Sequence, residues 1–170
     1  FLSRVEETGR KFYFFTNNSS KSQQAYIEKL SNMGISITKE QMMISSHVMI
    51  RFLLEKHPGK SVYVVGTPSL LNEFRSFGIP LVEKDPDIVV LGFDTTLTYE
   101  KLSRACHSIR NSCIYYGINP DLNCPMERGT FIPDCGSMAR LVEASTGRYP
   151  EFFGKPSEHT LNYMIQETGY

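Results

Sequence analysis

Short runs of β-branched and aromatic residues alternate along this chain with stretches that have helical hydrophobic spacing. The runs are almost continuously apolar, which is typical of parallel strands that are covered on both faces. Alternation of strand and helix periods predicts an α/β fold with a mainly parallel sheet. The strands are expected at residues 11–15, 61–65, 87–93 and 113–116.

Capping residues indicate where the expected helices begin. Thr67, Thr98 and Ser157 each stand where a side-chain oxygen can cap a helix, and Pro68 suits a first helical turn. Apolar residues follow at helical spacing and are expected to face the core. They are Tyr26, Ile27, Leu30 and Met33 in the first helix, Leu70, Leu71, Phe74 and Phe77 in the second, Leu102, Ala105, Cys106 and Ile109 in the third, and Leu161, Met164 and Ile165 in the last.

Charge and cysteine content restrict the functional classes. Lys plus Arg number 18 and Asp plus Glu number 18, and this balance argues against a protein built mainly to bind nucleic acid. The longest apolar runs are too short to cross a bilayer, so no membrane partner is expected. The four cysteines form no CxxC pair, which favours reduced thiols and a cytoplasmic location.

Hydroxyl and amide side chains follow the first expected strand. Residues 12–22 read FYFFTNNSSKS, so the strand ends near Thr16 and a helix follows to about residue 33. Ligands of open α/β sheets collect at the carboxyl ends of strands, and a helix N-terminus there attracts an anion. The same residue types also make ordinary turns and helix caps, and both readings stand at this point.

A lysine occupies a similar place near the other end of the chain. Residues 151–165 read EFFGKPSEHTLNYMI, so Lys155 follows a short apolar strand and precedes a capped helix. One ammonium group at the end of a strand is a suitable counter-charge for a phosphoryl group. Lysines in loops are more often simply exposed to solvent.

Taken together, the two segments resemble the second and third motifs of the haloacid dehalogenase superfamily. Their separation of about 140 residues is similar to that in the NagD-like and p-nitrophenyl-phosphatase-like branch, where a large α/β cap lies between these motifs. Four further segments resemble that cap, so the resemblance extends over essentially the whole chain. They are residues 65–70 (VGTPSL), 89–102 (VVLGFDTTLTYEKL), 117–121 (GINPD) and 124–148 (CPMERGTFIPDCGSMARLVEASTGR).

The resemblance implies a partial Rossmann-like core with an inserted α/β cap domain. The core would comprise residues 1–44 and 149–170, and the cap residues 45–148. The family's activity would be Mg²⁺-dependent hydrolysis of small phosphomonoesters through an aspartyl-phosphate intermediate. The sequence contains no DxDGT-like or GDxxxxD-like motif, so the nucleophile and the metal ligands are expected outside this chain. The chain alone is therefore expected to be inactive.

The resemblance also assigns roles to residues of the two motifs. Thr16 would bond a phosphate oxygen through its hydroxyl group, and Asn17 and Asn18 would add backbone or amide donors. Lys155 would be the catalytic residue of this chain, because it would pair with the phosphate and with the nucleophile.

Cap residues would select the substrate. The candidates are Asn119, Asp121 and Cys124, since residues 117–121 follow an expected strand and would face the core. An ordinary turn explains the same residues equally well.

Other functions stay open on sequence alone. The expected partner is a small phosphorylated metabolite, and a homodimer through the cap is one candidate assembly. The main alternative is a non-catalytic α/β module that binds a phosphorylated metabolite without cleaving it. A nucleotide-binding α/β domain of another family is a third reading, although no GxxxxGK[ST] sequence is present.

Overall fold

Three of the four expected strands form one parallel sheet with the short run near residue 152 in the computed structural model, which describes residues 1–170. Its strands are β3 (Val62–Val65), β4 (Ile88–Leu91), β5 (Ile114–Gly117) and β8 (Glu151–Phe152), in that order. All neighbouring pairs in this sheet are parallel. The expected α/β class is therefore confirmed, with strand positions that differ from the expected ones by a few residues at most.

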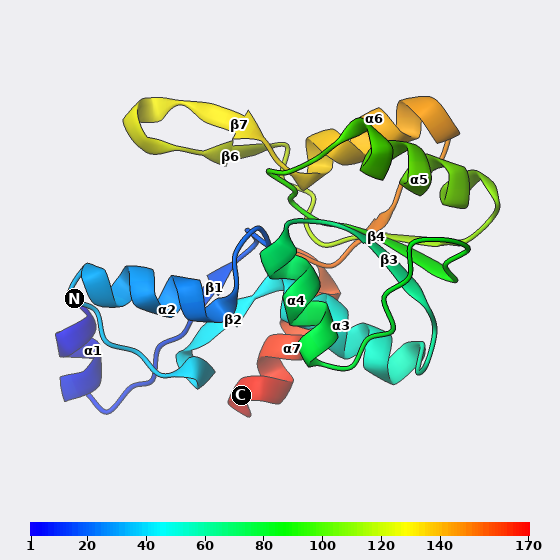
Figure 1. Ribbon diagram of the computed structural model, residues 1–170. Coiled ribbons are helices and arrows are strands. Elements are labelled where there is room, and N and C mark those ends of the chain that lie inside the picture. Colours follow the sequence, from blue (N-terminus) through cyan, green and yellow to red (C-terminus); the bar gives the residue numbers. More distant parts are fainter.

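Helices cover both faces of this sheet (Figure 1). One face packs against α3 (Ser45–Lys56) and α4 (Pro68–Ser76), and the other against α5 (Tyr99–Arg110) and α6 (Cys135–Thr146). Successive residues of a strand point to opposite faces, so one run supplies two cores. Val64 and Val90 lie in the first core, and Val65 and Leu91 lie in the second.

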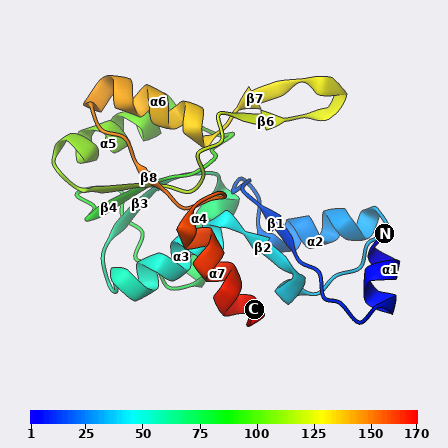
Figure 2. The same cartoon turned by 180° about the vertical axis from the view of Figure 1, so that it is seen from behind.

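A smaller parallel sheet lies beside the first and consists of β1 (Phe14–Thr16) and β2 (Met42–Ile44). The helices α1 (Leu2–Glu7) and α2 (Gln23–Asn32) extend from it to one side, and the short 3₁₀ helix η1 (Lys39–Gln41) precedes β2. Figure 2 shows α7 (Glu158–Thr168) beside α3, below the larger sheet. All three residues of β2 are buried. The apolar run 42–44 is therefore a core strand.

An antiparallel hairpin projects from the body of the molecule next to α6 (Figures 1 and 2). It consists of β6 (Asn123–Pro125) and β7 (Phe131–Pro133), with the 3₁₀ helix η2 (Glu127–Gly129) at its tip. Its apolar side chains Met126 and Phe131 are exposed. Short, proline-containing strands with exposed side chains carry little of the alternation that marks a strand in sequence.

The expected helix caps are present. The hydroxyl groups of Thr67, Thr98 and Ser157 accept hydrogen bonds from the third residue that follows each of them. The prediction that Leu161 and Ile165 of α7 face the core is wrong, because both side chains are exposed. Thr160 points inward instead, since its hydroxyl group donates to the carbonyl oxygen of Phe153 at 2.6 Å.

Phe77 and Met33 were expected to face the core, but they are also exposed. Each follows the last residue of its helix, where the chain turns away from the packed face. No helix of the structure combines the length and the apolar character that a membrane span needs.

The sheet that contains β3, β4 and β5 continues past residue 148, because β8 pairs with β5 through Tyr116–Glu151 and Gly117–Phe152. This strand lies on the other side of the expected boundary between cap and core. The division into residues 1–44, 45–148 and 149–170 stays a prediction.

Candidate anion-binding site

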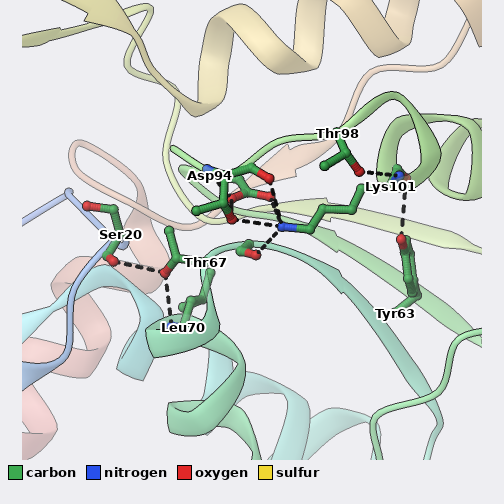
Figure 3. A network of polar contacts seen from close by, with 9 residues as sticks. Ser20, Tyr63, Thr67, Leu70, Asp94, Thr98 and Lys101 are labelled. Atoms are coloured by element: carbon green, nitrogen blue, oxygen red, sulfur yellow. Dashed lines mark hydrogen bonds and ion pairs between the residues drawn. The ribbon is translucent and has the colours of Figure 1, made fainter.

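The loop of residues 16–20 lies at the carboxyl ends of the parallel strands. After β4, the main-chain N–H of Phe93 donates to the buried hydroxyl group of Ser19 at 3.0 Å. After β3, the hydroxyl group of Thr67 donates to the carbonyl oxygen of Ser20 at 2.9 Å, as Figure 3 shows. These contacts fix the second half of the loop against the larger sheet.

An ion pair with a buried carboxylate holds the ends of β3 and β4 together beside this loop (Figure 3). The Lys101 ammonium group donates to the Asp94 carboxylate at 2.7 Å and to the Gly66 carbonyl oxygen at 3.0 Å. The Asp94 side chain is fully buried, so its charge needs this partner. The pair is part of the frame that carries the loop.

Asn17 joins the first half of the loop to two other segments. Its carbonyl oxygen accepts hydrogen bonds from the side chains of Asn119, at 2.8 Å, and Ser45, at 2.7 Å. Its side-chain oxygen accepts from the main-chain N–H of Lys155 at 2.8 Å. Its side-chain nitrogen donates to the Lys155 carbonyl oxygen and to the Asp121 carboxylate, each at 3.1 Å.

Lys155 lies where strand β1 ends. Its ammonium group donates to the carbonyl oxygen of Phe15 at 3.2 Å and lies 5.2 Å from the centroid of the Phe15 ring. The contact places the charge one residue from Thr16, and the aromatic face stabilises it there. Lys155 is exposed and forms no ion pair with a carboxylate. The ammonium group is therefore available to an external anion.

Gly154 is the residue that permits this approach. A Cβ atom at position 154 would lie 2.8 Å from the side-chain oxygen of Asn17 and 2.9 Å from the carbonyl oxygen of Ile118. Contacts this short do not occur with real side chains, so any larger residue would push Lys155 away from β1.

The hydroxyl group of Thr16 accepts a hydrogen bond from the main-chain N–H of Asn18 at 3.2 Å and keeps its own proton to donate. The side-chain oxygen of Asn18 accepts from the main-chain N–H and the hydroxyl group of Ser20, so it closes a local turn. Its side-chain nitrogen donates weakly to the Cys124 sulfur at 3.5 Å. Cys124 thus connects the hairpin to the loop.

All seven residues proposed from the sequence are brought together by these contacts. Asn119 is fully buried, and its side-chain oxygen accepts from the main-chain N–H of Asp121 at 3.0 Å. Both ends of its amide are used inside the protein, which is at odds with the direct substrate contact expected for it. Asp121 and Cys124 are only partly buried and lie at the base of the hairpin. Their role in substrate selection stays a prediction.

Two residues of the site were not identified from the sequence. Ser45 is fully buried, and it begins α3 directly after the apolar run 42–44. A hydroxyl group at the end of a buried strand was the available signal. The hydroxyl group of Tyr26 donates to the Asn18 carbonyl oxygen at 3.2 Å, and burial raises the pKa of this phenol. Its helical spacing indicated only a core role.

Burial changes the pKa values of two groups near the base of the hairpin, Cys124 and Asp134. Burial, and then the negative charge of Asp134, raise the pKa of the Cys124 thiol. Burial likewise raises the pKa of the Asp134 carboxyl group, against a hydrogen bond from the main-chain N–H of Cys135. Cys124 is therefore a neutral thiol at ordinary pH, suited to packing and weak hydrogen bonding.

The donor set of the site fits an anion and does not fit Mg²⁺. Hydroxyl, amide and ammonium groups surround the loop, and no group of three His, Cys, Asp or Glu side chains lies close enough together to hold a metal ion. The nearest carboxylate, Asp121, is occupied by Asn17. Mg²⁺ prefers several oxygen ligands at short distance.

A family model described as haloacid dehalogenase-like hydrolase matches residues 1–80. The acid sugar phosphatase of Staphylococcus saprophyticus is 34% identical over 167 residues, which are 98% of this chain and 64% of the relative. The 5'-nucleotidase YutF of Bacillus subtilis is 31% identical over 99% of this chain and 66% of its own length. The chain thus spans less than two thirds of the length of these relatives.

Solved structures give the same result. A protein assigned as nagD aligns with a TM-score of 0.95 at 38% identity, over 99% of this chain and 66% of its own. A 4-nitrophenylphosphatase from Thermotoga maritima aligns with a TM-score of 0.94 at 38% identity, over 99% of this chain and 64% of its own. Family model, relatives and structures agree, and the chain belongs to the NagD-like branch of the haloacid dehalogenase-like hydrolases.

Proposed function

We propose that the complete protein is a phosphatase that hydrolyses small phosphomonoesters. One observation carries the proposal: the Lys155 ammonium group has no carboxylate partner and lies at the carboxyl end of β1, next to Thr16. A cation without a partner, beside a hydroxyl donor at a strand end, is suited to a phosphoryl group. The names of the relatives, two phosphatases and a nucleotidase, support the same chemistry.

The residues of this chain would bind and polarise the phosphoryl group. The Thr16 hydroxyl would donate to one phosphoryl oxygen, and the Lys155 ammonium would offset the negative charge on another. Charge on these oxygens develops further in the transition state, so donors held rigidly in place stabilise it more than the ground state. The contacts of Asn17 and Phe15 with Lys155 supply that rigidity.

We also propose that the complete protein depends on Mg²⁺ and proceeds through an aspartyl-phosphate. The support is the family resemblance, since the residues of this chain do not form a Mg²⁺ site. The nucleophilic aspartate and the metal ligands would accordingly be outside these 170 residues. The roles assigned to Thr16 and Lys155 do not require either residue to bind the metal.

The substrate would contact the base of the hairpin as well as the loop. Cys124 and Asp121 lie there, partly exposed, on the side of the loop that carries Asn18 and Asn17. The relatives are named for a sugar phosphate, a nucleotide and a nitrophenyl ester, so this chain's substrate would be a small phosphorylated metabolite of that size range.

We place the protein in the cytoplasm. All four cysteines are free thiols in the structure, including the fully buried Cys135, and this fits a reducing compartment. A homodimer through the cap stays a prediction.

Phosphate release tests the proposed function. The complete protein would be assayed with sugar phosphates, nucleoside 5'-monophosphates and 4-nitrophenyl phosphate, with Mg²⁺ and after removal of Mg²⁺ with EDTA. We expect turnover of at least one ester that is lost with EDTA and restored by Mg²⁺. Phosphate binding without release from any ester would instead favour the non-catalytic binding module.

A further inference from the structure

Asn17 presents its side chain to the protein and not to the space where an anion would bind. The side-chain oxygen is occupied by the Lys155 N–H, and the side-chain nitrogen by the Lys155 carbonyl oxygen and the Asp121 carboxylate. An amide has one carbonyl oxygen and two N–H donors, so these contacts use both donors. The amide has no donor left for a phosphoryl oxygen.

We propose that Asn17 is a positioning residue whose amide clamps the main chain of Lys155, and that Asp121 fixes the orientation of this amide. The inference rests on the proposed function, because Lys155 must bind phosphate for its position to matter. The sequence led us to expect backbone or amide donors from Asn17 to the phosphate, and the clamp leaves only the backbone N–H for that role.

The geometry explains why an amide is needed here. The Lys155 N–H requires an acceptor, whereas the Lys155 carbonyl oxygen requires a donor, and only a side chain with both can serve them. The contact is similar to the pairing of two residues in a sheet, where N–H and C=O are exchanged. It ties the end of β8 to the end of β1, although β1 and β8 belong to different sheets.

Asp121 determines which way the Asn17 amide is oriented. Its carboxylate is an acceptor only, so it selects the amide orientation that directs the nitrogen toward Asp121 and the oxygen toward the Lys155 N–H. The main chain of Asp121 is itself fixed, because its carbonyl oxygen accepts from Gly136 N–H at 2.8 Å at the start of α6. A Cβ atom at position 136 would lie 2.2 Å from the Pro120 carbonyl oxygen, so this approach also depends on glycine.

The clamp therefore connects the base of the hairpin to the phosphate-binding lysine. A displacement of the loop 119–121 would reach Lys155 through one amide. The hairpin also contacts the loop of residues 16–20, where the side-chain nitrogen of Asn18 donates to the Cys124 sulfur. Substrate contacts at the hairpin base and charge at Lys155 are thus mechanically linked.

Exchange of the amide and the carboxylate tests the clamp. In Asn17→Asp, a carboxylate oxygen would replace the nitrogen opposite the Asp121 carboxylate and the Lys155 carbonyl oxygen. Like charges at this distance repel, and we expect affinity for inorganic phosphate and kcat/KM to fall about a hundredfold. In the double variant N17D/D121N, the new amide donates to the new carboxylate and removes the repulsion, while the Lys155 carbonyl oxygen stays without its donor, so we expect a partial recovery of about tenfold in both quantities.

Single Asp121→Asn keeps an acceptor for the Asn17 amide, so we expect a loss below about fivefold. Asn72→Asp is the matched control, because Asn72 is exposed on α4 and contacts only Arg75. N72D should match the wild type. If the Asn17 amide instead bound the phosphate directly, N17D/D121N would be as weak as N17D, and this result would overturn the clamp.

Calorimetric titration with inorganic phosphate separates this inference from the proposed function. A wild-type protein that binds phosphate but hydrolyses no ester would refute the phosphatase, while the pattern of affinities would still test the clamp. Thermal unfolding shows whether each variant folds. Should N17D not fold, a double variant that folds and binds phosphate within about tenfold of the wild type supports the clamp, and one that also fails to fold contradicts it.

Discussion

The ammonium group of Lys155 donates a hydrogen bond to the carbonyl oxygen of Phe15, 140 residues earlier in the chain. The contact brings the Lys155 ammonium group to the residue that precedes Thr16 at the end of β1. Two hydrogen bonds between the Asn17 side chain, after β1, and the main chain of Lys155, after β8, hold the ends of these strands together. A phosphoryl group bound there would face a cation and a hydroxyl donor at once.

Lys155→Met tests the cation in the complete protein. The methionine keeps the length of the side chain but removes the charge, so we expect kcat/KM to fall about a hundredfold or more, as for other groups that stabilise a transition state. Steady-state kinetics with 4-nitrophenyl phosphate measures the effect. Lys84→Met is the control, since Lys84 is exposed and precedes β4, at the end of that strand opposite to the site. Equal turnover by K155M and K84M would remove Lys155 from the mechanism.

Cys124→Ala tests the hairpin base as the element that selects the substrate. Loss of the sulfur opens space beside Asn18 and removes a weak hydrogen bond. We expect the ratio of kcat/KM between a sugar phosphate and a nucleoside 5'-monophosphate to change by about tenfold, the usual effect of one small group in a pocket. Cys113→Ala, a change at a partly buried cysteine before β5, should leave the ratio unchanged. An unaltered ratio in C124A would count against the assignment.

Much of this site is visible in the sequence, and the limits have physical causes. Local signals were sufficient for the strand ends near Thr16 and Lys155 and for the helix caps at Thr67 and Ser157. The hairpin gave no such signal, because its side chains are mostly exposed and its strands contain Pro125 and Pro133.

The role of Asn17 could not be predicted either. Its partners, Asp121 and Lys155, lie 104 and 138 residues away. Turn chemistry accounts for an asparagine after a strand without any such partner. Likewise, Leu161 has the right spacing for a core residue, but the hydrogen bond of Thr160 sets the orientation of α7.

Lys101→Met tests the ion pair between Lys101 and the buried Asp94 carboxylate. The substitution leaves the buried Asp94 carboxylate with its hydrogen bonds from Thr96 but without a cation, so we expect the free energy of unfolding to fall by about 3 kcal/mol. In D94N/K101M no charge remains unpaired, and the loss should be smaller than in K101M alone. Urea unfolding of the single and double variants gives the comparison. A double variant less stable than K101M would show that the pair is not what holds these strand ends.

Asp87 gives a prediction about acid stability. The ammonium group of Lys60, followed by the N–H and the hydroxyl group of Ser61, lowers the pKa of the Asp87 carboxyl group from 3.8 to about 2. A carboxyl group whose pKa is lowered in the folded state stabilises the fold at pH values above its ordinary pKa of 3.8. This contribution is lost as the pH falls through about 2.

Asp87→Asn removes this proton linkage. Between pH 3.8 and about 2, the free energy of unfolding should therefore depend less steeply on pH in D87N than in the wild type. Urea titrations at several pH values in this interval measure both slopes. Identical slopes would show that the carboxylate at β4 does not contribute to acid stability.

Co-crystallisation of the complete protein with inorganic phosphate tests most directly whether Thr16 and Lys155 converge on one anion. The account predicts a phosphate ion with oxygens within about 3.2 Å of both the Thr16 hydroxyl and the Lys155 ammonium group, while the Asn17 amide keeps its contacts with Lys155. A phosphate ion bound elsewhere, with the Lys155 ammonium group directed away from Thr16, would contradict it.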